Sequence, residues 1–273
     1  MGGVPTSGDA MGAGPLPSDA VSILDPTLHP TVLVVQNDAS DPPLLAGEWL
    51  SEAGIRLTVL NAWAGDLVPR RVEPVISGIL VLGGAPNAHD DHAAPWLADV
   101  RALLADAVSA DVPVLGLCLG GQLLAAALGG RVELSPITEV GLVYVERTEA
   151  GLTDPLVSSL QAPGDRIPAT QWHHDHITEL PDGAVVLLTN SACRVQAFRV
   201  GEHAYGLQMH PEVDADAFDG WSTEHDDALE RSGRTGAQAA AEVRAEQGAL
   251  IAAWRPMILG WAELVWAYAT DRR

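Results

Sequence analysis

A cysteine with glycines on both sides lies where a buried strand should turn into a helix. Gly116 and Gly120 stand two residues before and after Cys118, and a helical segment follows at 122–128. A nucleophile on such a sharp turn adopts a strained backbone, and the glycines leave room for it. The helix start favours the thiolate, and the next backbone N–H, that of Leu119, is placed to bind an oxyanion. Cys118 is therefore a candidate nucleophile, with a buried, unreactive cysteine as the alternative.

A histidine and a glutamate two residues apart close the last apolar strand. In an extended segment the side chains of His210 and Glu212 lie on the same side, and Pro211 stiffens the link between them. A histidine that takes a proton from a thiol needs a fixed tautomer, which a carboxylate on its other ring nitrogen supplies. The pair is a candidate general base with its orienting partner. The alternative is a core histidine beside a glutamate that begins a helix.

A glycine pair follows the strand expected at 78–82. The segment Gly83-Gly84-Ala85-Pro86 can direct a backbone N–H toward a site above the strand ends. Such a group, with Gly84 as the candidate, would be a second oxyanion donor. An ordinary tight turn is the alternative.

Strand and helix alternate along the first half of the chain, which predicts an α/β fold with a parallel-sheet core and helices on both faces. Buried strands are expected at 31–37, 56–62, 78–82 and 113–117, and helices at 49–53, 95–110 and 122–128. The carboxyl ends of such strands form the usual ligand site of α/β sheets.

The second half of the chain has a different pattern. Strands at 141–147, 184–189, 194–200 and 204–209 predict an antiparallel extension of the sheet. Residues 214–235 are polar and predict a loop, and 236–270 predict two helices divided at Pro256. We expect a disordered tail at 1–29 and a single domain at 30–273.

Composition excludes several functions. The net charge of −21 disfavours nucleic acid and anionic membrane surfaces as partners. All 15 basic residues are arginine, so lysine Schiff-base chemistry and P-loop nucleotide binding are excluded. Two cysteines are too few for a disulfide scaffold, no segment is long and apolar enough to span a membrane, and we expect no signal peptide. We therefore expect a cytoplasmic protein.

Three segments together resemble the signatures of the class-I, or triad, glutamine amidotransferases: 82–86, 116–122 and 208–212. Within that family the chain is similar to stand-alone proteins related to the glutaminase domain of GMP synthase, through 127–131, 139–141 and 171–175. The resemblance implies a flavodoxin-like fold and a catalytic triad of Cys118, His210 and Glu212. It also implies a γ-glutamyl pocket that includes Gln122, the Gly84 loop, His173 and Asp175. Trp172 departs from the serine found in many members.

The resemblance implies hydrolysis of the γ-amide of glutamine through a cysteine thioester, which releases glutamate and ammonia. The chain shows no ATP-binding signature of a synthase, so it would either feed ammonia to a synthase subunit or act as a free-standing γ-glutamyl peptidase. A cysteine hydrolase of the deglycase or intracellular-peptidase type is another alternative, against which His-Pro-Glu argues. A regulatory or scaffold protein is disfavoured because all three triad residues are present.

Two histidine-rich segments resemble metal sites. They are His89-Asp90-Asp91-His92 and His173-His174-Asp175-His176. The first is expected to be a solvated turn, and alternation along a strand would divide the second between two faces. Thiol chemistry needs no metal, so we expect no metal and no cofactor.

Overall fold

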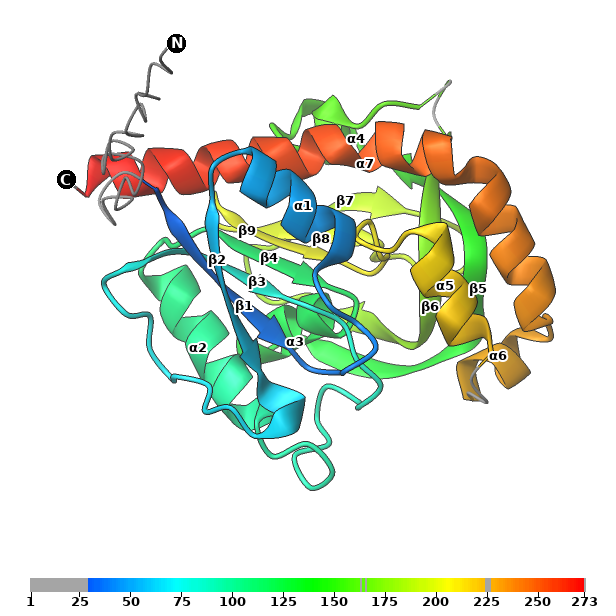
Figure 1. Cartoon of the computed structure of the whole chain (residues 1–273), viewed down its shortest axis with the longest axis horizontal. Helices are drawn as coiled ribbons and strands as arrows, with labels where there is room; N and C mark the ends of the chain where they lie inside the picture. Colours follow the sequence, from blue (N-terminus) through cyan, green and yellow to red (C-terminus); the bar gives the residue numbers. More distant parts are fainter. Residues whose placement is uncertain (1–28, 163, 165, 224–226, 273) are drawn as a thin grey trace, which may run out of the picture.

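The computed structural model describes residues 29–162, 164, 166–223 and 227–272. A nine-stranded mixed sheet within these residues has the strand order β2-β1-β3-β4-β9-β8-β7-β5-β6 (Figure 1). The strands are β1 Thr31–Gln36, β2 Arg56–Asn61, β3 Ile76–Val81, β4 Val114–Leu117, β5 Arg131–Arg147, β6 Arg166–Glu179, β7 Val185–Thr189, β8 Ala197–Val200 and β9 Ala204–Leu207. Neighbouring strands pair in parallel from β2 through β1, β3 and β4 to β9. The remaining pairs, which are β9–β8, β8–β7, β7–β5 and β5–β6, are antiparallel. The predicted fold class, a parallel core with an antiparallel extension, is confirmed.

Helices cover both faces of the sheet. They are α1 Leu44–Glu52, α2 Leu97–Ser109, α3 Leu119–Ala127, α4 Glu149–Thr153, α5 Ala215–Ser222, α6 Asp227–Ser232 and α7 Gly236–Asp271, with short 3-10 turns at Ala62–Ala64 and Val157–Ser159. In Figure 1, α1 and α7 lie on one face, and α2 and α3 on the other. Strand β1 shows why, because Val32 and Val34 pack with the first pair of helices while Leu33 and Val35 pack with the second.

Two sequence predictions in the C-terminal part are wrong. Residues 214–235 are not simply a loop, because they contain α5 and α6. Asp214 caps α5 through its side chain, which accepts hydrogen bonds from the backbone of Asp216 and Ala217 at 3.0 and 2.7 Å. This local capping begins a helix despite the polar composition.

The C-terminal segment is one helix, not two, since α7 continues through Pro256. Buried side chains on both sides of the proline, among them Trp254, Met257 and Trp261, pack in the same core cluster. This packing offsets the backbone hydrogen bond that proline removes.

The tail predicted at 1–29 lies outside the described residues except for His29, whose Nδ1 is 2.9 Å from the carbonyl oxygen of Gly54. No helix of the described part of the chain has both the length and the apolar character needed to cross a membrane.

Candidate active site

Cys118 occupies a strained position between β4 and α3. Its backbone torsion angles are φ 47° and ψ −108°, which side-chain-bearing residues seldom adopt. Close packing holds it there, because a Cβ on Gly120 would lie 2.0 Å from the carbonyl oxygen of Val81, and one on Gly116 would lie 2.5 Å from the backbone of Gly120. The Cys118 N–H donates to the Leu207 carbonyl at 2.8 Å. The glycines of the predicted elbow are therefore required by the packing of α3 on the sheet.

His210 and Glu212 follow β9, the neighbour of β4 in the sheet. His210 Nδ1 lies 2.7 Å from Glu212 Oε1, and both side chains are almost fully buried. The backbone N–H of His210 donates to the Thr170 carbonyl at 2.9 Å, which ties the segment to β6. Because Glu212 accepts at Nδ1, the other ring nitrogen remains for proton exchange.

The electrostatics of His210 favour its charged form. Burial lowers the pKa of His210, but Cys118 and Glu212 outweigh burial through charge and hydrogen bonding and hold that pKa well above the usual value. A raised pKa favours the protonated imidazole, which is the form that a general acid needs.

A cavity of about 480 Å³ opens above these residues. It brings together six residues named from the sequence, which are Gly84, Cys118, Gln122, His173, Asp175 and His210. Nine more residues also line it, namely Asp38, Ser40, Asp41, Ala85, Pro86, Trp172, His174, Trp221 and Ala228. Leu119 and Glu212 are buried beside this set, so every predicted site residue lies in or next to one cavity.

The Gly84 loop is fixed by a residue that sequence reasoning missed. Asn37, which follows β1, donates to the carbonyl of Leu82 at 2.8 Å and accepts from Trp96 Nε1 at 3.2 Å. A Cβ on Gly84 would lie 3.1 Å from Asn37 and 3.4 Å from Leu119. The loop therefore sits close against the start of α3, where the candidate oxyanion donors are expected.

Gln122 uses its amide nitrogen within the protein. Nε2 donates to the Asp175 carbonyl at 3.1 Å and to Gln208 Oε1 at 3.2 Å, and Gln208 Nε2 lies 3.8 Å from Cys118 Sγ. Gln208 is thus a neighbour of the thiol that the sequence did not identify as one. This chain of amides fixes β6 and β9 relative to the elbow.

A buried polar network stands behind His173. Its Nδ1 is 2.8 Å from the Asp175 carbonyl, and its Nε2 is 3.1 Å from Glu139 Oε2. Glu139 also accepts from Asn190 and Gln196, each at 2.7 Å. Burial raises the pKa of Glu139, but His173 and the two amides outweigh it, so the pKa is lowered and the carboxylate stays charged. His173 is held rigidly at the cavity wall.

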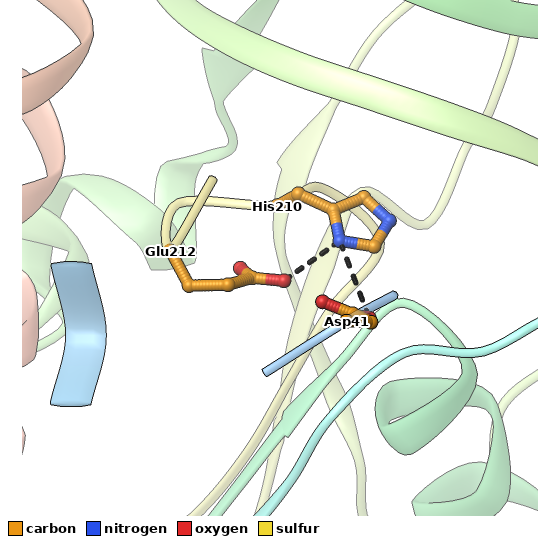
Figure 2. Close-up of side chains that lie close together, drawn as sticks. All are labelled: Asp41, His210 and Glu212. Atoms are coloured by element: carbon orange, nitrogen blue, oxygen red, sulfur yellow. Dashed lines mark hydrogen bonds and ion pairs between the residues drawn. The ribbon is translucent and has the colours of Figure 1, made fainter. Parts of the chain in front are cut away.

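Asp41 and Trp221 are two further residues that the sequence did not reveal. The Trp221 ring stands edge-on to His210 with 4.9 Å between ring centroids, and its Nε1 donates to the Ser40 carbonyl at 2.9 Å. Figure 2 shows Asp41 and Glu212 both directed toward His210 Nδ1, with Asp41 Oδ2 at 4.0 Å. One ligand atom from each of Asp41, His210 and Glu212 lies within 4.8 Å of the other two, a spacing that is compatible with a bound cation.

The two histidine-rich segments differ in exposure and in the element that carries them. Residues 89–92 form an exposed turn. Along β6, His173 and Asp175 are buried whereas His174 and His176 are half-buried. Asp175 accepts from Asn87 at 2.7 Å, so it too is part of the cavity's internal bonding.

Comparison with known proteins identifies the family. Residues 50–223 match the class-I glutamine amidotransferase family. The glutamine amidotransferase-like protein YfeJ of Salmonella typhimurium is 32% identical over 176 residues, which cover 63% of this chain and 72% of YfeJ. GMP synthase of Brucella melitensis is 31% identical over 189 residues, covering 68% of this chain but only 35% of the synthase.

Two solved structures agree in fold and sequence. The glutamine amidotransferase of Thermotoga maritima has a TM-score of 0.75 at 26% identity, covering 86% of this chain and 99% of its own. That of Methylobacillus flagellatus has a TM-score of 0.70 at 31% identity, covering 89% and 95%. The chain therefore belongs to the class-I glutamine amidotransferase family.

Proposed function

We propose that the protein hydrolyses a γ-glutamyl amide through a thioester on Cys118, with glutamine as the simplest substrate. The observation that carries the proposal is that Cys118 and His210 line the same cavity. Cys118 stands on a strained turn, and the buried Glu212 orients His210. This arrangement supplies an activated nucleophile, a general acid–base and an orienting carboxylate. Family membership supports the same chemistry.

The reaction would proceed in two steps. The Cys118 thiolate attacks the γ-carbonyl carbon, and the N–H groups of Gly84 and Leu119 bind the oxyanion. His210 gives its proton to the departing amine as the carbon–nitrogen bond breaks. Water, deprotonated by His210, then attacks the thioester, which releases the γ-carboxylate and restores the thiolate. With glutamine, the products are glutamate and ammonia.

Two versions of this function differ in the amine that hydrolysis releases. In the first version it is ammonia for a synthase, and in the second it is the amine of a γ-glutamyl peptide or conjugate. The chain spans about a third of the length of a glutamine-hydrolysing GMP synthase, and this likeness supports the first version, in which a synthase receives the ammonia. The cavity of about 480 Å³ favours the second version, because this volume lies in the range of roughly 300–1,000 Å³ found for drug-sized ligands. A γ-glutamyl peptide or conjugate, larger than glutamine, would fit such a space.

Labelling with a glutamine analogue that carries an electrophilic γ-carbon tests the chemistry. We expect Cys118 to be labelled and Cys193 to be spared, since burial and the nearby Glu139 raise the pKa of Cys193 to about 12. Turnover of glutamine and of γ-glutamyl dipeptides should vanish in Cys118→Ala and persist in Cys193→Ala. Labelling of Cys193, or unchanged turnover in Cys118→Ala, would refute the proposal.

A further inference from the structure

Asp41 is a buried carboxyl for which the proposed reaction has no use. Its side chain is 4% exposed, and neither carboxyl oxygen has a hydrogen-bond partner among the described residues. The same holds for Glu212 Oε2, the oxygen that His210 leaves free. Buried polar atoms without partners cost free energy, so such a pair needs a physical explanation.

The neighbouring glycine shows that Asp41 is built into the site. A Cβ on Gly83 would lie 2.2 Å from Asp41 Oδ2 and 2.8 Å from His210 Cε1. Gly83 does not have the positive φ that makes glycine necessary for backbone reasons. Its missing side chain therefore serves to let the Asp41 carboxyl approach the imidazole.

Charge balance decides the protonation state of this cluster. Three titratable groups face Asp41. Glu212 and His210 come from the segment after β9, and Asp38 comes from the same loop as Asp41. Burial, then Glu212, raises the pKa of Asp41 to about 8, although His210 lowers it. Two carboxylates beside one imidazole cannot both be charged without a large cost, as in other buried carboxyl pairs. One proton on the Asp41 carboxyl makes Asp41 a hydrogen-bond donor and leaves Glu212 Oε2 as the acceptor.

We propose that Asp41 is a positioning residue that holds a proton and donates it in a hydrogen bond to Glu212 Oε2, which fixes the carboxylate that orients His210. The inference rests on the proposed function of the Cys118–His210 pair. A cation in the same place would need the lone pair of His210 Nδ1, which would break the 2.7 Å bond to Glu212. It would also place the ring proton on the nitrogen needed to exchange a proton with the thiol.

Ionisation of Asp41 should then impair the reaction. A second negative charge 4.0 Å from His210 Nδ1 strengthens the hold of the imidazolium on its proton. Transfer of that proton to the leaving amine becomes harder, so activity should fall as the pH rises past the pKa of Asp41, about 8.

The test compares pH profiles of the full chain and two Asp41 variants. Asp41→Asn keeps the shape and stays a neutral donor at every pH, whereas Asp41→Ala has no donor. We expect the wild-type rate to fall above pH 8, Asp41→Asn to keep most of its rate at pH 7 without that fall, and Asp41→Ala to lose ~10-fold in kcat with little change in KM. Asp182→Asn, which removes an exposed aspartate in the turn after β6, should match the wild type.

A second readout separates this inference from the proposed function. The rate of Cys118 alkylation by iodoacetamide reports the state of the thiol and needs no turnover. If no γ-glutamyl compound is hydrolysed, the proposed function fails, yet a step in alkylation near pH 8 that Asp41→Asn abolishes still supports the role of Asp41. Identical pH profiles for wild type and Asp41→Asn would overturn the inference. So would equal losses at pH 7 in Asn and Ala variants, or activity that EDTA abolishes and a metal ion restores.

Discussion

The strained elbow should make Cys118 costly for folding, and this cost can be measured by comparing Cys118→Ala with Cys118→Gly. Both variants lack the sulfur, so their difference isolates the backbone at φ 47° and ψ −108°. Holding a residue with a side chain in such a region costs about 1–3 kcal/mol, while glycine loses about 0.5–1 kcal/mol in chain entropy. Cys118→Gly should therefore unfold with a free energy about 1 kcal/mol higher than that of Cys118→Ala.

Urea unfolding followed by circular dichroism, with thermal melts as a check, measures this difference. Each kcal/mol corresponds to about 2–4 °C in Tm for a chain of this size. Ala126→Gly within α3 is the control, because there the backbone is helical and glycine should cost about 1 kcal/mol. Equal stability of the two Cys118 variants, or a less stable Cys118→Gly, would show that the elbow stores no strain.

Two further predictions concern Asp41 and Gly83. Because the pKa of Asp41 rises from 3.8 to about 8 on folding, the folded chain binds a proton that the unfolded chain has lost, and stability falls as the pH rises through this window. Asp41→Asn does not titrate, so its free energy of unfolding should rise relative to that of the wild type between pH 4 and pH 7, by at most about 4 kcal/mol for three pKa units. Thermal melts measure this, and a stability difference between the two proteins that does not change with pH would contradict the reasoning. Gly83→Ala should lower turnover by ~10-fold through its clash with Asp41 and His210, whereas Gly248→Ala, in open space on α7, should leave kinetics unchanged in the same assay.

The parallel half of the sheet was predictable because its strands are short apolar runs. Strands β1, β3 and β4 are buried at every position, which gives a local signal that does not depend on distant contacts. The elbow and the His210–Glu212 pair were predictable for a similar reason, since each consists of a few adjacent residues whose spacing dictates geometry.

Alternation along a strand was considered only for 173–176, and the full length of β6 was not predicted, because its buried face carries polar groups. The face that holds Gln171, His173 and Asp175 points inward, where it joins Glu139 and Gln122 in hydrogen bonds. Hydrophobic alternation, the usual sign of a half-buried strand, is therefore absent along most of its length. The resemblance identified residues 171–175 as part of the site, but it did not reveal that they lie on a 14-residue strand.

Asp41 and Trp221 could not be identified as site residues because long-range packing brings them to His210. Asp41 lies 169 positions before His210, and Trp221 belongs to a helix in a segment whose composition predicts a loop. The room that Gly83 leaves for Asp41 depends on contacts between the loop after β1, the loop after β3 and the segment after β9. Neither local propensity nor motif spacing contains that information.

The site divides between two parts of the fold with different roles. Cys118 and His210 come from adjacent parallel strands, where close glycine packing and Glu212 fix them. The opposite wall is aromatic, since Trp172 of β6 stacks edge-on against Phe218 and Trp221 of α5 at 5.2 and 5.9 Å. Trp221 of this wall also contacts the imidazole, with 4.9 Å between its ring centroid and that of His210. In the proposed reaction, the parallel core would position the groups that break the bond, and the aromatic wall would help to place the imidazole and would border the space for the leaving amine.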